Sequence, residues 1–516
     1  MNSLNQNGRQ FVDALVSTKG RLEARKYEAE HAETVHVVGA GGALTAAYEQ
    51  LRNAAEYAEE HLLLQRAIRR FYQRLFLSRD KAAASASGEE LIVELTLAGY
   101  LPNDSVALSL IESINVLAAR YYTARMAIGL AKHRTNAWTL DVLAVEVELL
   151  LNDSTKEDAF VDFCHRHFTQ SINQAVMFGH EQSDFEVALF VAVHRALLRS
   201  DEASIRVALL RRYNQSPEDV EGYKTINLKL DALFASDTAD KLFRFVRRQG
   251  APLRVLWRMV DENGEIDDIL QQQTKFLSAY ELQIANEYDD LARRINKGII
   301  KSVVFLFITK FLIGLAIEVP YDLMVHGAVL WLALGINLLF PPIYMVLLRL
   351  TMTLPGSANT HAMVDAADKL LYGQGTSLIL ARQGRNSFGA AYNIAYAIFF
   401  VVVFGGVSLL LWNLGFSFVH LIIFFIFLST ASFLGFRLSR QVRDLEVVEA
   451  DQTSVTTVRD FLYMPFVIVG RWISDRYASV NVVAMVLDML IELPLKTVLR
   501  LLRQWSAFIT NKKDEL

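Results

Sequence analysis

The 516-residue sequence contains a single cysteine, Cys164. One thiol cannot form a disulfide within the chain, and such low cysteine use is typical of proteins in a reducing compartment. The first twenty residues also lack the apolar run of about seven residues that a cleaved secretory signal needs. We therefore expect the leading part of the chain to stay in the cytosol.

The sequence has no excess of basic residues. Its 52 Lys and Arg are outnumbered by 56 Asp and Glu, which gives a formal net charge of −4. A nucleic-acid partner is disfavoured, because its phosphates require a basic surplus gathered on one face. We also find no nucleotide-binding loop, no catalytic carboxylate pair and no nucleophile beside a base. These absences favour a non-enzymatic protein, and we predict no bound cofactor.

Charge is missing altogether from one long stretch, because no Asp, Glu, Lys or Arg lies between Asn386 and Phe436. Apolar residues make up 52% of the whole chain, and the excess over a soluble protein is concentrated after residue 298. The first 298 residues instead mix charged side chains with leucine and alanine. This division indicates two different solvents, water for the first part and lipid for the second.

Four segments have the roughly 20 apolar residues that an α-helix needs to cross a bilayer. The uncharged stretch is too long for one crossing, and the polar sequence "WNLG" at Trp412–Gly415 divides it into a predicted hairpin of two helices. The four predicted crossings are Ile299–Glu318, Gly327–Leu348, Ala391–Leu414 and Phe416–Phe436.

The basic residues next to these segments predict their direction. Lys and Arg gather before the first crossing, between the second and third, and after the fourth, whereas the other two connections have none. By the positive-inside rule both termini are cytoplasmic, and we expect the cell membrane. The terminal "KDEL" is then a charged chain end and not a luminal retrieval signal. The basic residues are Arg293, Arg294, Lys297, Lys301, Arg349, Lys369, Arg382, Arg385, Arg437, Arg440 and Arg443.

The predicted fold class is all-α, because apolar residues recur three or four apart through most of the leading region. The segment from Tyr280 to the first crossing contains no proline, so we predict that it forms a stalk helix. The tail after Leu495 has an apolar face that lies in the membrane interface or packs on the soluble domain. The predicted regions are a cytoplasmic helical domain at 1–298, two crossings at 299–348, a cytoplasmic loop at 349–390, a transmembrane hairpin at 391–436 and an amphipathic cytoplasmic tail at 437–516.

Lys310 lies about eleven residues inside the first crossing, where a charge costs about 2.5–3.5 kcal/mol on an isolated helix. Glu318 follows at a helical angle of about 80°, which predicts that it is too far round the helix for a direct pair. In the second crossing Asn337 precedes Pro341 and Pro342, whose missing N–H groups leave carbonyls free. We predict a polar site of Lys310, Asn337 and the two prolines. It is either part of a permeation path or a braced helix kink.

Three polar residues gather where the first crossing ends. Glu318, Asp322 and His326 flank Pro320 in the connection to the second crossing. In an oligomer these residues would form an acidic ring at an outer mouth that concentrates cations. The alternative is a polar loop among lipid headgroups.

Two patterns in the leading region resemble binding sites. Asp158, Asp162 and His165 share one helix face and would suit a divalent metal, but no second cluster completes a site, so we predict none. A basic face follows from Arg66 at helical spacing and is either solvated or in contact with anionic lipid. The other arginines of this face are Arg69, Arg70 and Arg74.

Two functions fit these observations. The first is a membrane-anchored scaffold or sensor whose helical domain binds an unidentified cytoplasmic protein and whose stalk couples that domain to the membrane bundle. The second is a homo-oligomeric ion channel or transporter that uses the region of Lys310 and Asn337. Four crossings enclose little space, so the second function requires several copies of the chain. In both, the lipid bilayer is a partner.

Overall fold

The computed structural model describes residues 3–37, 45–46, 49, 62–129, 133–152, 154–373, 390–448 and 454–478. In these ranges the regular secondary structure is helical throughout, with one isolated bridge between Thr34 and Ala107. The predicted all-α class is therefore confirmed. The described residues form two compact units, a bundle unit drawn from residues 1–5, 171–180 and 247–480 and an N-terminal unit drawn from residues 6–170 and 181–246.

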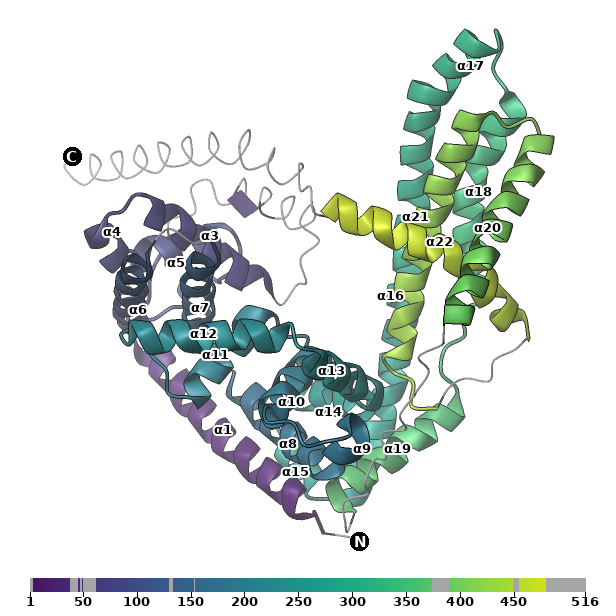
Figure 1. Ribbon diagram of the computed structural model, residues 1–516. Coiled ribbons are helices and arrows are strands. Elements are labelled where there is room, and N and C mark those ends of the chain that lie inside the picture. The colour runs from purple at the N-terminus through teal and green to yellow at the C-terminus, as the bar shows by residue number, and fades with distance from the viewer. Residues whose placement is uncertain are drawn as a thin grey trace. The chain divides into compact units, whose positions relative to one another are not determined.

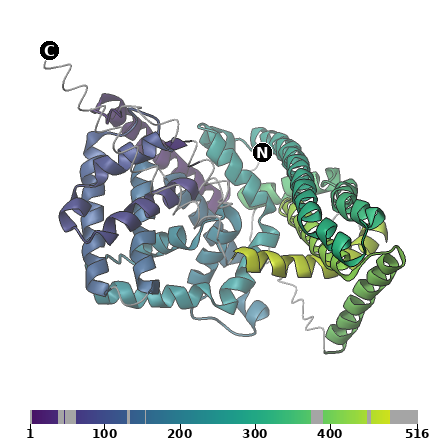
Figure 2. The same ribbon diagram turned by 90° about the horizontal axis from the view of Figure 1, so that it is seen from above.

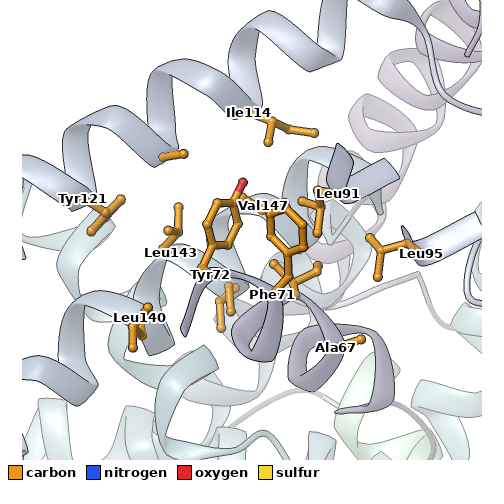
Figure 3. Packing of buried hydrophobic residues seen from close by; sticks show 14 of the residues in the cluster. Ala67, Phe71, Tyr72, Leu91, Leu95, Ile114, Tyr121, Leu140, Leu143 and Val147 are labelled. Atoms are coloured by element: carbon orange, nitrogen blue, oxygen red, sulfur yellow. The ribbon is translucent and has the colours of Figure 1, made fainter. Parts of the chain in front are cut away.

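The N-terminal unit buries an apolar core between helices. Helix α3 (Leu63–Leu77) places Phe71 and Tyr72 on its inner face, 4% and 0% exposed, opposite Leu91 and Ile114 (Figure 3). Burying each large apolar side chain stabilises the fold by about 1.5–3 kcal/mol. The other described helices are α1 (Gln6–His31), α4 (Lys81–Ser85), α5 (Gly88–Leu97), α6 (Leu108–Ile128), α7 (His133–Leu151), α8 (Thr155–Ser171), α10 (Phe185–Val193), η2 (His194–Leu198), α11 (Glu202–Arg212), α12 (Val220–Phe234) and α13 (Asp237–Gln249).

The bundle unit contains the apolar helices. Among the described residues, four segments are long and apolar enough to cross a membrane: Gln273–Val325, Trp331–Leu350, Ile394–Asn413 and Phe418–Arg443. The predicted number of apolar spans is therefore confirmed by helix length and composition. The helices of this unit are α9 (Gln174–Phe178), α14 (Ala251–Glu262), α15 (Ile266–Leu270), α16 (Gln273–Ile313), η3 (Gly314–Glu318), α17 (Val319–Val325), α18 (Trp331–Leu350), α19 (Ser357–Tyr372), α20 (Ala390–Asn413), α21 (Phe418–Arg443) and α22 (Ser454–Ala478).

Helix α16 is unbroken for 41 residues and corresponds to the predicted stalk together with the first crossing. It contains no proline and only one glycine, Gly298, so nothing in its sequence interrupts the hydrogen-bond ladder. At about 1.5 Å per residue it is about 60 Å long, roughly twice the hydrocarbon thickness of a bilayer. In Figure 1 it runs, in teal, from α19 at its foot toward α17 at its far end.

The first half of α16 is held by polar contacts to α14 and α19. The Tyr280 hydroxyl donates to the Pro252 carbonyl oxygen at 2.8 Å, and Gln273 donates to the Asp368 carboxylate at 2.7 Å. Helix α19 lies inside the predicted loop 349–390. Its Asn359 is 3% exposed and donates to the carbonyl of Leu445, just after α21. The end of the fourth span is therefore joined to the helices around the foot of α16.

The α20–α21 hairpin turns where the sequence predicts. The Leu411 carbonyl accepts from the amides of Leu414 and Phe416, and Gly415 between them has φ +85°. This geometry is a common helix C-terminus that strongly favours glycine. Only 6% of the apolar window of α20 is buried, and α20 lies at the edge of the group of apolar helices in Figure 2.

Helix α22 runs across α21 instead of alongside it, as Figures 1 and 2 both show. At the crossing a Cβ on Gly470 would lie 2.1 Å from the Ser429 carbonyl oxygen and 2.8 Å from Phe433 Cβ. The two helices can approach this closely only because residue 470 has no side chain. At Gly435, in contrast, the nearest atom to an added Cβ would be Leu348 Cδ1 at 2.6 Å, which is the movable end of a side chain.

We predict that Gly470→Ala destabilises the protein by about 1–3 kcal/mol or more, because main-chain atoms cannot move aside for the methyl group. The matched variant Gly435→Ala should be milder, since the leucine can change rotamer. Thermal unfolding of the detergent-purified chain, followed by tryptophan fluorescence, measures both. Equal melting temperatures for the two variants would contradict the close crossing.

Candidate functional site: a buried polar cluster

Lys310 forms an ion pair inside the bundle. Its ammonium group donates to Glu318 Oε1 at 2.5 Å, and the two side chains are 1% and 0% exposed. The ammonium also lies 5.0 Å from the ring centroid of Phe427 on α21, a distance suited to a cation–π interaction. The lysine is thus turned toward other protein groups, as a charge in an apolar span requires.

The prediction that Glu318 is too far round the helix from Lys310 is wrong, and the cause is the π-helical turn η3 at Gly314–Glu318. A π turn inserts one extra residue, so Glu318 occupies about the angle of a seventh residue and lies only about 20° from Lys310. Pro320 follows directly. A proline in a helix has no N–H to donate and crowds the preceding turn, which favours a widened turn at this point.

Asn337 on α18 joins the same pair. Its amide donates to Glu318 Oε1 and to the carbonyl oxygen of His420, both at 3.3 Å. Lys310 and Asn337, predicted in one site, are thus brought together through Glu318, which the sequence places at the outer mouth. Helix α18 continues through Pro341 and Pro342, both of which are buried. Because Pro341 follows Asn337 by four residues, it lies on the same helix face.

Asp322, one helical turn beyond Glu318, is 0% exposed and faces inward. Its Oδ2 accepts from the Leu330 amide at 2.9 Å and lies 3.5 Å from His420 Nε2. His326 is different, because its side chain is 36% exposed and its Nδ1 lies 3.7 Å from Asp322 Oδ1. Of the three predicted outer-mouth residues, two are therefore buried in the bundle and one lies at its edge.

Two members of the cluster, His420 and Ser417, were not predicted from the sequence. His420 is 0% exposed, and its Nδ1 lies 2.7 Å from the hydroxyl oxygen of Ser417 at the start of α21. A signal was present, because His420 is the only histidine in the uncharged stretch from Asn386 to Phe436. An ionisable residue in such a stretch is a functional-site candidate by default.

Several polar atoms of the cluster make no hydrogen bond within the described part of the chain. They are Glu318 Oε2, Asp322 Oδ1, Asn337 Oδ1 and His420 Nε2. A buried polar atom without a partner costs about 1–3 kcal/mol, so native proteins keep few of them. Four such atoms in one cluster, next to an ion pair, make this group the strongest candidate site among the described residues.

The face of Asp158, Asp162 and His165 lies on α8, and its histidine is engaged in a contact within the fold. His165 Nε2 donates to the Glu186 carbonyl oxygen at 3.0 Å, so this nitrogen is engaged within the fold. Burial lowers the pKa of this imidazole below its ordinary value. Across the described ranges no group of three His, Cys, Asp or Glu side chains is arranged to hold a metal ion.

The basic face on α3 is largely neutralised by carboxylates. Arg69 Nε lies 2.5 Å from Asp141 Oδ1, and Arg70 Nη2 lies 2.6 Å from Glu49 Oε2. Arg74 pairs in the same way with Glu94 at 2.6 Å. A cavity of about 450 Å³ opens beside them, and acidic side chains line it together with arginines. This mixed lining weakens attraction to anionic lipid. The cavity is lined by Gln65, Arg66, Arg69, Arg70, Asp141 and Asp201, among others.

Some predicted features lie outside the described residues, namely Arg382 and Arg385 and the amphipathic tail from Leu495. Comparison with known proteins adds no assignment. No family model, curated protein or solved structure matches this chain. The polar cluster is therefore interpreted from its own geometry.

We predict that Lys310→Met or Glu318→Gln alone destabilises the bundle by about 3–5 kcal/mol, because each leaves a buried partner unpaired. The double variant should recover much of this loss. Unfolding of the purified protein by titration with a denaturing detergent measures the double-mutant cycle.

The exposed pair Arg471–Asp475 on α22, with side chains 74% and 69% exposed, is the matched control. Its coupling should be below about 0.5 kcal/mol, as for other surface pairs on helices. Additive losses at Lys310 and Glu318 would show that their interaction contributes nothing to stability.

Proposed function

We propose that this protein is a membrane-anchored sensor or scaffold in which α16 couples a polar cluster in the bilayer to helices outside it. The observation that carries the proposal is the continuity of α16 from Gln273 to Ile313. A helix without a hinge transmits a shift at one end to the other, because its hydrogen-bond ladder resists bending.

Both ends of α16 have the contacts that such coupling requires. At the foot, Tyr280 and Ile284 are 0% exposed among α14 and its neighbours. At the far end, Lys310 is bound to Glu318, and through Asn337 to α18. A change in the protonation or pairing of the cluster therefore acts directly on the helix that α14 and α19 rest on.

The alternative function is a homo-oligomeric ion channel or transporter, and the observation that favours it is the set of ionisable groups buried among apolar helices. Lys310, Glu318, Asp322 and His420 are each at most 1% exposed. Such groups mark ion and proton pathways in many membrane proteins. The exposed apolar surface of α20 would supply contacts to further copies of the chain. Within one chain the Lys310–Glu318 ion pair favours a fixed brace over a path.

The coupling proposal predicts that the double variant Lys310→Met/Glu318→Gln changes amide hydrogen exchange in α14 and α19. We expect opening free energies there to shift by about 0.5–2 kcal/mol, the range found for coupling through packed networks. Adding Ile300→Pro, at a position 64% exposed, should abolish the effect by breaking α16. Hydrogen exchange with mass spectrometry of the reconstituted protein measures each variant.

Leu312→Ala is the matched control, because Leu312 lies near Lys310 on α16 but is 57% exposed. It should leave exchange in α14 and α19 unchanged. If vesicles containing the wild-type chain pass protons or monovalent cations, and Lys310→Met assembles normally but abolishes that flux, the channel or transporter function replaces the sensor.

We further propose that both termini are cytoplasmic and that the connection after α17 faces the outside of the cell membrane. The distribution of basic residues supports this topology, because Arg293, Arg294 and Arg349 all flank the same ends of the helices. The native thiol of Cys164 is buried and does not interfere with labelling. Single added cysteines can therefore report sidedness.

We predict that Met324→Cys reacts with a membrane-impermeant maleimide in intact cells, because Met324, in the last turn of α17 beside the proposed outer connection, is 87% exposed. Arg293→Cys, at a side chain 76% exposed on the opposite side, should react only after lysis. Gel-shift labelling measures both. The opposite pattern of reaction would invert the proposed topology.

A further inference from the structure

The charges of the buried cluster do not balance. Lys310 supplies one positive group, whereas Glu318 and Asp322 supply two negative groups, and all three are at most 1% exposed. Glu318 is compensated directly by Lys310 at 2.5 Å. Asp322 is left as the carboxylate without a permanent cation beside it. A buried charge in this position requires a compensating positive group.

His420 is placed to supply that group. Its Nε2 lies 3.5 Å from Asp322 Oδ2, and its Nδ1 lies 2.7 Å from the Ser417 hydroxyl oxygen. A neutral imidazole has one N–H, but the imidazolium form has two and donates at both nitrogens. With one added proton, His420 donates to Asp322 at Nε2 and to the Ser417 oxygen at Nδ1, and it supplies the positive charge that the cluster lacks. The added proton also gives His420 Nε2, one of the atoms without a hydrogen bond in the described chain, a role as donor.

We propose that Asp322 and His420 form a binding site for one exchangeable proton. The proton taken from water resides on His420 Nε2, and the Asp322 carboxylate remains negative beside it. The inference rests on the proposed sensor function and deepens it, because it names the proton as the signal that the bundle receives.

His326 provides an entry to the site. It is the exposed member of the group, and its Nδ1 approaches Asp322 Oδ1 at 3.7 Å, while Asp322 Oδ2 faces His420 on the inner side. The two carboxylate oxygens thus connect an exposed imidazole with a buried one. Histidine is suited to such a relay because it exchanges protons near neutral pH.

Among the described residues, the other polar side chains near the pair are a neutral amide and the carboxylate of Glu318, which is already compensated by Lys310. Asn337 on α18 reaches the backbone of His420 with a neutral amide, and Lys310 is bound to Glu318. The Tyr344 hydroxyl oxygen on α18 accepts from Ser432, three turns along α21 from His420. Arg459 on α22 donates to Thr351, after the end of α18. A metal ion fits less well than a proton, because the described residues place no three ionisable ligands around one point.

Nitrogen NMR of the full chain tests the proposal, with ¹⁵N-labelled histidine and reconstitution in liposomes. The spectrum of His420→Gln is subtracted from that of the wild type to isolate the signal of His420. We expect an imidazolium at neutral pH, with hydrogen on both ring nitrogens. In Asp322→Asn the same ring should carry hydrogen on one nitrogen only, because its counter-charge is gone.

His326→Gln is the matched control, since it removes the exposed histidine on the same carboxylate and should leave His420 an imidazolium. A neutral His420 ring in the wild type would overturn the proposal. So would loss of the charged signal in His326→Gln, which would assign the proton to His326. A charged signal that changes when sodium replaces choline in the buffer would identify a metal cation as the ligand and overturn the proton assignment.

A variant that does not fold leaves the proposal testable on the wild type alone. The wild-type spectrum must contain an imidazolium that exchanges with deuterated water more slowly than the exposed histidines do, and the absence of such a signal overturns the site. Hydrogen exchange in α14 and α19 of Asp322→Asn separates this inference from the sensor function. If the His420 ring is charged in the wild type and neutral in Asp322→Asn, but hydrogen exchange in α14 and α19 is unchanged, the proton site stands. That result contradicts the sensor function.

Discussion

The desolvation of Lys310 is the constraint on which the bundle depends. An ammonium group 1% exposed among apolar helices must be paired, and Glu318 pairs with it at 2.5 Å. This contact holds the helix after Gly314 at one rotation about its axis. The same rotation turns Asp322 inward. The contact also sets where Asn337 on α18 must lie, because the same carboxylate oxygen accepts from its amide. One ion pair thus determines how three segments of the bundle meet.

A close backbone contact and a tight turn also hold the helices of the bundle together. Gly470 lets α22 cross α21 at a distance that no side chain would permit, and the turn at Gly415 returns the chain from α20 to α21. Polar contacts then tie the end of α21 to α19, where Asn359 holds the chain after α21. The apolar helices and the foot of α16 consequently belong to one compact unit, although they differ in the polarity of their own exposed side chains.

The sequence was sufficient to predict the helical class, the four apolar spans and the turn at Trp412–Gly415, because length, hydropathy and glycine placement are local properties. It was also sufficient to single out Lys310 and Asn337 as polar residues in apolar helices. The contact between Lys310 and Glu318 was not predictable from an ideal helix, since the π turn rotates Glu318 by about 100°. His420 required knowledge of which helix packs beside α17, and that depends on tertiary structure.

In the sensor function proposed above, the length of α16 supplies a lever arm. A rod of about 60 Å that pivots at its Lys310 end by only about 5° displaces its other end by about 5 Å. Displacements of that size exceed the tolerance of packed side chains, so neighbouring helices must change their packing. Under that proposal, a rearrangement at one carboxylate is magnified into a movement large enough for another protein to recognise.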